Sequence, residues 1–376
     1  MELSFVFPCL NEARTLAACI GAVKAALQQE PNLQFEIVVA DNGSSDESRS
    51  IALACGARVV PVAQRGYGAA LRAGIEAAEG RLVMFADADG TYLYEHALEL
   101  YRATAKADAD MGIASRMRGH IEPGAMPMLH RRLGTPVLTT LINWLFAGAL
   151  SDCNSGFRCL RKSAYQQWGI RASGMEFASE LLIKALKHQA RTVEIVSGLR
   201  PAPVERTPHL RTWRDGMRHL LFILSERPRL FEVSGLLLIV LSSLLQAMAG
   251  LRGEVQLAGA SLLGLHSQVL LFLGGLVGAQ IYGLSAAMFL QRSESPRRLT
   301  RSLIEMDEGS LFGLLLLLLA GMTAVIGWLV WHWIQKDFSG LQQESTLLLS
   351  LHFLVLPALI TMNLLGVHVL RKGQQS

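Results

Sequence analysis

The chain has 376 residues, of which 51% are hydrophobic and only 18% charged, and its mean hydropathy is +0.32. Residues 1–231 hold 27 of the 35 lysines and arginines and 23 of the 31 acids, so the net charge of +4 belongs to them and residues 232–376 are neutral. This split excludes a disordered or purely soluble protein. The sequence has no dense basic stripe with interleaved aromatic residues, which argues against nucleic acid as the main partner.

Four short apolar runs before residue 90 have the composition of β-strands: residues 3–7, 35–40, 58–62 and 82–86. Continuous apolar runs of this length are typical of strands that are covered on both faces of a parallel sheet. Between them, Leu16, Ile20, Val23 and Leu27 recur at helical spacing, and residues 69–78 are rich in helix formers. The alternation predicts a doubly wound α/β domain, in which ligands bind beyond the carboxyl ends of the strands.

Polar or turn-forming residues follow three of these runs: Pro8, Asn11, Glu12, Asp41, Asp87 and Asp89. Asp87 and Asp89 are two residues apart in extended chain, so their carboxylates project to one side and can share a hard divalent cation. The alternatives are a turn or helix cap at this pair and an Asx turn at Asp41. The first run is not followed by G-x-G-x-x-G or a P-loop, which argues against a dinucleotide cofactor and that type of ATP hydrolysis.

Two segments that contain glycine keep two interpretations open. Residues 65–69 precede a helix and either bring backbone close to a phosphate or form a plain loop. Residues 117–130 either close over a substrate or form a surface loop.

A basic segment separates the two parts of the chain. Seven arginines lie among apolar side chains in residues 199–231: Arg200, Arg206, Arg211, Arg214, Arg218, Arg227 and Arg229. The apolar side chains are Trp213, Leu220, Leu221, Phe222 and Leu224. Cations beside an apolar stripe at helical spacing predict a helix that lies in the membrane interface.

The second part contains four charge-free runs, residues 233–251, 255–291, 309–335 and 345–370. A bilayer span needs about 20 apolar residues, so we predict spans at about 233–251, 262–290, 310–334 and 346–370. These spans contain no acid, lysine or arginine, which argues against an ion-coupled transporter. Gly274, Gly275 and Gly278 would allow close helix contact, and Pro357 would kink the fourth span.

The distribution of cations predicts the orientation. The connection at residues 292–301 carries four arginines and the C-terminal tail carries Arg371 and Lys372, whereas the connections on the other side carry one cation each. The positive-inside rule then places the N-terminal domain in the cytoplasm. Residues 1–10 lack the pattern of a signal peptide. The five cysteines (Cys9, Cys19, Cys55, Cys153 and Cys159) all lie in this domain, and we expect reduced thiols.

Together, residues 8–12, 41–46, 87–89 (a DXD motif) and 151–158 resemble family 2 glycosyltransferases of the GT-A fold, especially the polyprenyl-phosphate (dolichyl-phosphate) mannosyl- and glucosyltransferases. The resemblance covers roughly residues 1–231, and residues 174–180 and 208–216 resemble a bacterial subgroup with membrane-spanning C-termini. It implies a GT-A domain at 1–198, an interfacial amphipathic segment at 199–231 and an all-α transmembrane domain of four helices at 232–376.

The resemblance also implies roles for individual residues. The nucleotide sugar would be held by Pro8, Asn11, Glu12, Asp41, Asp87 and Asp152. Asp87 and Asp89 would bind Mg²⁺ or Mn²⁺; Thr91 replaces the glutamine that is a further metal ligand in some relatives. Arg116 and Arg131, with Arg132 as an adjacent substitute, would contact the acceptor phosphate, and Asp89, Arg116 and Arg131 would be catalytic. Asp152 and Arg158 would form the back of the donor pocket, or a buried ion pair.

The reaction implied is an inverting transfer of a hexose from a UDP-glucose or GDP-mannose type of donor to polyprenyl phosphate, such as undecaprenyl or dolichyl phosphate. It would occur at the cytoplasmic face of a membrane, the inner membrane in a bacterium. A lipid phosphate is anionic at neutral pH and needs no general base. The alternatives are another lipid acceptor, such as diacylglycerol or ceramide, and a non-catalytic membrane scaffold with a GT-A shell. Association of copies through the spans is a further expectation.

Overall fold

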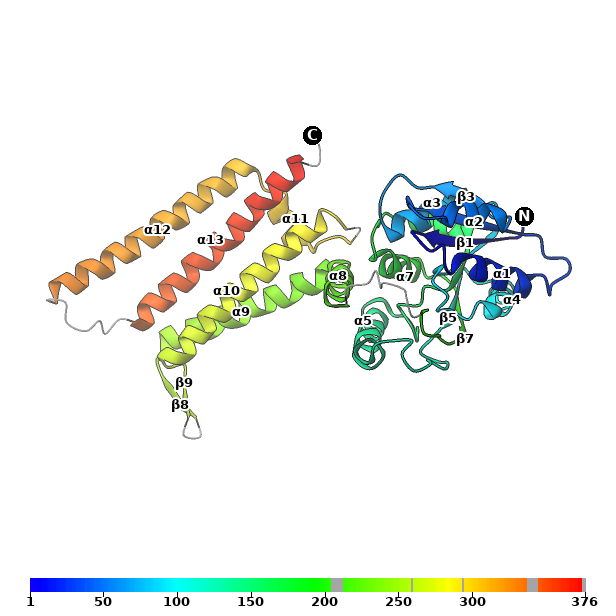
Figure 1. Cartoon of the computed structure of the whole chain (residues 1–376). Helices are drawn as coiled ribbons and strands as arrows, with labels where there is room; N and C mark the ends of the chain where they lie inside the picture. Colours follow the sequence, from blue (N-terminus) through cyan, green and yellow to red (C-terminus); the bar gives the residue numbers. More distant parts are fainter. Residues whose placement is uncertain (204–211, 258–259, 293, 337–343, 374–376) are drawn as a thin grey trace. The chain divides into compact units, whose positions relative to one another are not determined.

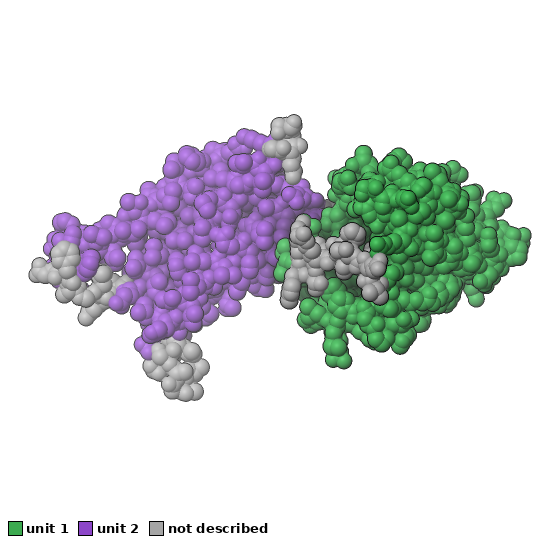
Figure 2. Space-filling view, in the orientation of Figure 1, with its two compact units in different colours: residues 1–224 green, residues 225–376 purple. Residues whose placement is uncertain are grey.

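The computed structural model describes residues 1–203, 212–257, 260–292, 294–336 and 344–373. The chain forms two compact units, residues 1–224 and residues 225–376 (Figure 1 and Figure 2). Each unit has its own set of secondary-structure elements and is described separately.

The first unit is built on a seven-stranded sheet in the order β3-β2-β1-β4-β6-β5-β7. Its strands are β1 (Leu3–Cys9), β2 (Phe35–Asp41), β3 (Arg58–Pro61), β4 (Leu82–Phe85), β5 (Met111–Ser115), β6 (Arg158–Arg161) and β7 (Thr192–Val196). β1 pairs in parallel with β2 and β4, whereas β6 is antiparallel to both β4 and β5. The predicted doubly wound α/β fold is confirmed. Strand order reverses between β1 and β4, which is where such sheets form a ligand crevice.

Helices cover both faces of this sheet. They are α1 (Leu16–Leu27), α2 (Ser48–Ala54), α3 (Tyr67–Ala77), α4 (Ala97–Lys106), α5 (Thr135–Phe146), α6 (Lys162–Trp168), α7 (Phe177–Lys187) and α8 (Thr212–Ser225). Two short turns, η1 (Tyr94–His96) and η2 (His130–Gly134), precede α4 and α5. Because side chains alternate along a strand, Phe5 and Phe7 of β1 enter one core with α1, and Val6 enters the other with α3.

The register of the central strands aligns their carboxyl ends. Cys9 of β1 pairs with Asp41 of β2, and Val6 pairs with Phe85 of β4. The residues that follow these strands therefore leave the sheet at one edge, as the sequence predicts.

The second unit contains four helices that are long and apolar enough to cross a membrane: α9 (Pro228–Arg252), α10 (Leu265–Phe289), α12 (Glu308–Gln335) and α13 (Glu344–Gly373). A short hairpin, β8 (Val255–Leu257) and β9 (Ala260–Leu262), joins α9 to α10, and α11 (Arg298–Ile304) lies between α10 and α12. The sequence pattern does not predict the hairpin. Helix α9 also begins before the predicted span, so it includes the buried Glu232, whose Oε1 accepts a hydrogen bond from the Arg297 amide at 3.0 Å.

Glycine packing in this unit confirms two of three expectations. A Cβ built on Gly278 would lie 2.8 Å from the Leu238 Cβ of α9, and one on Gly275 would lie 2.9 Å from His352 of α13. A Cβ on Gly274 meets no described atom within 4 Å, so its predicted role in helix contact is wrong.

Helix α8 carries part of the predicted interfacial segment. Leu220, Phe222 and Leu224 pack against the core of the first unit, whereas Leu221 is 59% exposed. Protein therefore covers part of the apolar stripe that the sequence assigns to the membrane interface. Arg206 and Arg211 lie outside the described residues, as do the side chains of Trp213 and Arg214.

Candidate functional site

The loops after β1 and β2 bind each other. The Asn42 amide donates to the Cys9 carbonyl at 2.8 Å, and Asp46 Oδ2 accepts from the Ala13 amide at 3.0 Å. Asn11 has a left-handed backbone (φ 59°), and its Oδ1 accepts from the Ser45 amide at 2.8 Å. These bonds bring the predicted nucleotide-binding residues Pro8, Asn11, Glu12 and Asp41 to one edge of the sheet.

Asp41 is fully buried at the end of β2. Its Oδ1 accepts from the Ser44 amide at 3.0 Å and its Oδ2 accepts from Arg49 Nε at 2.5 Å. Burial alone would raise the pKa of Asp41, but the bonds from Ser44 and Arg49 outweigh it, and the net pKa is lowered. Asp41 is therefore an anion at neutral pH, and its side chain closes a turn onto the amide three residues on, one residue further than in the Asx turn that the sequence allows.

Asp87 and Asp89 follow β4 at the same edge. Asp89 is nearly buried, and its Oδ1 accepts from the Thr91 amide at 3.0 Å and from Thr91 Oγ1 at 2.6 Å. The Tyr94 hydroxyl donates to the Asp87 carbonyl at 2.5 Å, and the Tyr67 hydroxyl and Asp87 Oδ2 both lie beside Gly156. The Thr91 hydroxyl thus orients Asp89.

The chemistry of these groups fits a divalent cation. Two carboxylates supply the hard oxygen ligands that Mg²⁺ and Mn²⁺ prefer, and a nucleoside diphosphate and water would supply the rest. Among the described residues, no group of three or more His, Cys, Asp or Glu side chains has a metal-binding arrangement.

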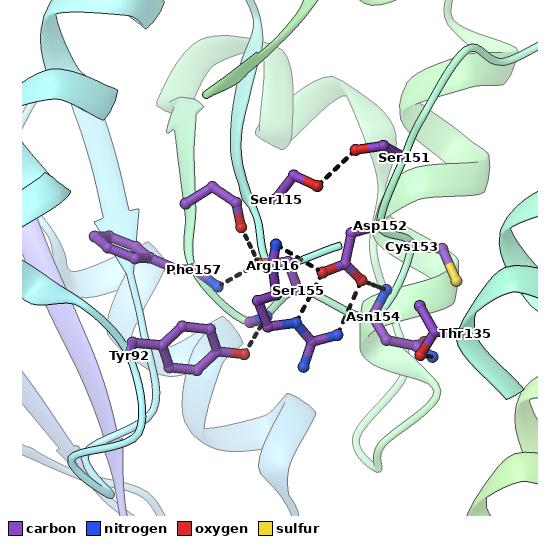
Figure 3. Close-up of polar contacts among 12 residues, drawn as sticks. Tyr92, Ser115, Arg116, Thr135, Ser151, Asp152, Cys153, Asn154, Ser155 and Phe157 are labelled. Atoms are coloured by element: carbon purple, nitrogen blue, oxygen red, sulfur yellow. Dashed lines mark hydrogen bonds and ion pairs between the residues drawn. The ribbon is translucent and has the colours of Figure 1, made fainter. Parts of the chain in front are cut away.

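Arg116, at the end of β5, forms a two-pronged ion pair with Asp152 (Figure 3). Arg116 Nε donates to Asp152 Oδ2 at 2.8 Å and Nη2 donates to Oδ1 at 2.9 Å, and the Arg116 amide donates to Oδ2 at 3.1 Å. Both side chains are buried. Burial alone would raise the pKa of Asp152, but Arg116 outweighs it and the net pKa is lowered.

Arg158 is 1% exposed and has other partners. Its Nη2 donates to the Cys153 carbonyl at 2.8 Å and its Nη1 donates to the Ala178 carbonyl at 3.1 Å. The ion pair between Asp152 and Arg158 that the sequence allows is therefore wrong, because Asp152 pairs with Arg116 instead.

Arg131 and Arg132 have exposed side chains in η2. Burial and then the positive charge of Arg116 lower the pKa of the preceding His130. Of the three predicted acceptor arginines, Arg116 is buried in an ion pair, whereas Arg131 and Arg132 are exposed.

The glycines of residues 65–69 have a structural explanation. The Ala69 amide at the start of α3 donates to the Ser173 carbonyl at 3.0 Å. Gly66 has φ +135°, and a Cβ on it would lie 2.1 Å from the same Ser173 oxygen. The close backbone approach that these glycines permit is thus made by the Ser173 carbonyl, which favours the plain-loop interpretation of residues 65–69.

The segment after β5 is partly fixed. The Glu122 amide donates to the Leu199 carbonyl at 3.0 Å, and the Leu199 amide donates to the His120 carbonyl at 3.1 Å. A Cβ on Gly119 would overlap the Ser197 carbonyl oxygen, at 1.2 Å. Residues 119–122 therefore lie along residues 197–199, where Ile121 and Leu199 form an isolated β-bridge.

The tyrosines around Asp87 are the site residues that the sequence does not single out. Tyr67, Tyr92 and Tyr94 all lie near the two carboxylates. Burial, then the Asp87 charge, raises the pKa of Tyr67, so its phenol remains a donor at neutral pH. For Tyr92 and Tyr94, the sequence signal that could have identified them as site residues is their closeness to Asp89 in the chain.

Comparisons with known proteins point to one enzyme family. The family model "Glycosyl transferase family 2" matches residues 4–169. A low-salt glycan biosynthesis hexosyltransferase of Haloferax volcanii is 34% identical over 90% of this chain and 82% of its own length. A dolichyl-phosphate beta-glucosyltransferase of Drosophila melanogaster is 32% identical over 43% of this chain and 55% of its own. A structure of glucosyl-3-phosphoglycerate synthase from Mycobacterium tuberculosis matches 60% of this chain and 79% of its own, with 21% identity and a TM-score of 0.49.

Proposed function

The chain belongs to glycosyltransferase family 2, and we propose that it transfers one hexose from a nucleoside-diphosphate sugar to polyprenyl phosphate. The observation that carries the proposal is the carboxylate pair Asp87 and Asp89, placed beside the β1 and β2 loops at the point where strand order reverses. Four helices of membrane length support an acceptor that resides in a bilayer. The name of the Drosophila relative supports a lipid phosphate.

On the donor side, Pro8, Asn11, Glu12 and Asp41 would hold the nucleoside, which is of the UDP-glucose or GDP-mannose type. Asp87 and Asp89 would hold Mg²⁺ or Mn²⁺, which when bound neutralises charge on the departing diphosphate. Thr91 keeps Asp89 oriented for this task through its two hydrogen bonds.

On the acceptor side, a deprotonated phosphate oxygen of the lipid attacks C1 of the sugar opposite the diphosphate. A new C1–O bond forms, the old C1–O bond breaks, and its electron pair leaves on the nucleoside diphosphate, so the configuration at C1 inverts. No proton is transferred. Asp152 holds two of the three guanidinium nitrogens of Arg116. Arg116 would thus offer its remaining nitrogen, Nη1, to the phosphate, with Arg131 and Arg132 beside it.

A hydroxyl acceptor would need a general base. Glu180, a buried carboxylate of α7, is engaged elsewhere: its Oε2 accepts from the Arg171 and Ala172 amides at 3.0 and 2.6 Å, and its Oε1 pairs with Lys184 at 2.8 Å. Because Glu180 holds the loop at residues 171–172, it is a poor candidate for the general base, and this favours the phosphate acceptor. The basic residues at 292–301 and in the tail favour a cytoplasmic active site.

The proposal can be tested with full-length protein in nanodiscs, Mn²⁺, a panel of labelled nucleotide sugars and undecaprenyl or dolichyl phosphate. We expect a labelled lipid from one donor and at least about a 100-fold lower rate for Asp89→Asn. Asp108→Asn is the matched control, because Asp108 is an exposed aspartate that pairs with Arg161 and Arg191 in the loop before β5.

Two results would overturn the proposal. One is the absence of product with every donor, and the other is an Asp89→Asn variant as active as Asp108→Asn. Transfer to diacylglycerol or ceramide, but not to either polyprenyl phosphate, would instead support the hydroxyl-acceptor alternative.

A further inference from the structure

Three groups converge on one glycine beside the predicted metal-binding carboxylates. A Cβ built on Gly156 would lie 2.8 Å from Tyr92 Oη, 3.0 Å from Asp87 Oδ2 and 3.4 Å from Tyr67 Oη. The Gly156 amide also donates to Tyr92 Oη at 2.7 Å. The two phenols and the carboxylate are thus packed around one point where only a hydrogen fits.

Within this cluster, Tyr67 Oη and Asp87 Oδ2 lie 3.4 and 3.0 Å from the same point, and after burial the Asp87 charge is the main cause that raises the pKa of Tyr67. The other contacts of the tyrosines go to the backbone, since Tyr94 donates to the Asp87 carbonyl and Tyr92 accepts from Gly156. Tyr94 therefore fixes the loop, and Tyr67 acts on the orientation of the Asp87 side chain.

The backbone of Tyr67 is held from both sides. The Gly66 amide donates to Asn42 Oδ1 at 2.7 Å, and the Ala69 amide donates to the Ser173 carbonyl at 3.0 Å. Asn42 directly follows Asp41 of the predicted nucleoside site, and Tyr67 directly follows Gly66. The bond between Asn42 and Gly66 therefore connects the nucleoside site to the residue beside Asp87. A side chain mounted this rigidly can hold its partner in one orientation.

We propose that Tyr67 is a positioning residue for the metal site: its hydroxyl donates to Asp87 and holds the carboxylate in the orientation that binds Mg²⁺ or Mn²⁺. A carboxylate offers about four lone-pair positions on two oxygens, so one can accept from tyrosine while another binds a cation. Without the hydroxyl, the Asp87 side chain gains rotational freedom that cation binding must remove. This inference rests on the proposed function.

The test compares full-length wild type, Tyr67→Phe and Tyr165→Phe in nanodiscs. Tyr165 is a buried tyrosine of α6, in the core that contains Val6 and α3. Its variant therefore loses a hydroxyl that is remote from the carboxylates. Mn²⁺ binding is measured by the paramagnetic resonance signal of free Mn²⁺, in the presence of UDP and separately of GDP. Hydrogen bonds to metal ligands typically contribute 10- to 100-fold to metal affinity, and we expect Tyr67→Phe to weaken Mn²⁺ binding by about this factor.

A second readout separates positioning from general damage. The transfer rate of Tyr67→Phe should recover toward the wild-type rate at saturating Mn²⁺, because the remaining defect is one of metal affinity. Tyr165→Phe should bind Mn²⁺ like wild type. If Tyr67→Phe fails to fold, Gly156→Ala places a methyl group at the convergence point and should also weaken Mn²⁺ binding.

Equal Mn²⁺ titrations for wild type and Tyr67→Phe would overturn the inference and leave the proposed function intact. An equal loss in Tyr165→Phe would also overturn it, since that loss would be nonspecific. If wild type fails to bind Mn²⁺ both in the presence of UDP and in the presence of GDP, the inference is overturned together with the metal-dependent donor site on which it rests.

Discussion

Buried polar side chains are satisfied differently in the two units. In the first unit, several buried charges form closed sets, as in the fork between Arg116 and Asp152 or the contact of Asp41 with Ser44 and Arg49, although Nε of Arg72 and of Arg158 has no hydrogen-bond partner among the described residues. In the described part of the second unit, several buried polar atoms have no hydrogen-bond partner: both amide atoms of Gln246, Oε1 of Gln268, Nδ1 of His352 and Oε2 of Glu232.

The difference indicates what polarity does in each unit. In the first unit, buried charges hold the loops that carry the site, and removing one partner exposes the other to an apolar environment. In the second unit, packing of glycines and apolar side chains joins the helices, and buried amides contribute little to stability. Three substitutions and a change of pH test this contrast, in order of decreasing effect.

Arg116→Ala should have the largest effect. It leaves the Asp152 carboxylate buried without its counter-ion, which typically costs about 3–5 kcal/mol. Hydrogen exchange followed by mass spectrometry, on peptides of β5 and β6 in the full chain, measures the loss. Arg118→Ala is the control, because Arg118 is 52% exposed and lies 3.8 Å from Glu194, a pair worth about 1 kcal/mol or less. Equal stability of the two variants would show that Arg116 acts on substrate alone.

Gly278→Leu should destabilise the second unit by about 1–3 kcal/mol, because the new side chain meets the backbone of α9 at Gly235 and Ile239. Gly274→Leu adds the same atoms to an open position and should leave thermal unfolding in detergent unchanged. Similar melting temperatures for the two variants would contradict the packing role of Gly278.

Acid should weaken the first unit by a smaller and gradual amount. Burial alone would raise the pKa of Asp41, Asp46 and Asp152, but hydrogen bonds and arginine neighbours outweigh it, and each pKa is lowered. A carboxylate whose pKa is lowered in the folded state stabilises the fold. Its contribution to the free energy of unfolding is fully present above the unfolded-state pKa of about 4 and is lost as pH falls through the folded-state pKa.

Pulsed hydrogen exchange after equilibration at each pH should therefore show β1 and β2 losing protection below about pH 4. Asp152→Asn should flatten this acid dependence. A protection profile of the first unit that does not change down to pH 2 would contradict the assigned pKa directions.

Gln246→Leu should have the smallest effect, between no change and a stabilisation of about 1 kcal/mol, because it removes an amide with neither atom paired. In Gln268→Leu a bonded amide is lost, since Gln268 Nε2 donates to the Leu263 carbonyl and to Ser345 Oγ. That loss should cost about 0.6–1.7 kcal/mol. Melting in detergent compares the two, and a strongly destabilised Gln246→Leu would break the contrast between the units.

The strands and the first helices could be predicted because their apolar periodicity is local. The aligned carboxyl ends of β1, β2 and β4 then follow from general rules for parallel sheets. Antiparallel β6 could not be found this way, because the pairing of Arg158 with Phe85 joins segments far apart in the chain. The hairpin between α9 and α10 is too short to show a pattern.

For the site, residue type located the carboxylates but could not assign partners. Asp152 has two arginine candidates in the sequence, and only the packing at the end of β5 selects Arg116 over Arg158. Gly66 and Gly68 have the sequence pattern of a phosphate loop, and the approach of residues 172–174, a hundred positions away, favours a plain loop instead. The sequence does not single out Tyr67 for the same reason, since its closeness to Asp87 depends on tertiary packing around Gly156.

The cysteines have a consequence for mapping the chain across a membrane. All five lie in the first unit, four are buried, and only Cys55 is partly exposed. A Cys55→Ser chain would thus have no readily reactive thiol, and the second unit has no native cysteine to remove. New cysteines at the exposed Glu254, beside the hairpin, and at the exposed Ser302 of α11 would then report, by their reaction with a membrane-impermeant maleimide, on which side of the membrane each position lies. In intact cells, labelling at position 254 and protection at position 302 is the pattern that a cytoplasmic active site requires.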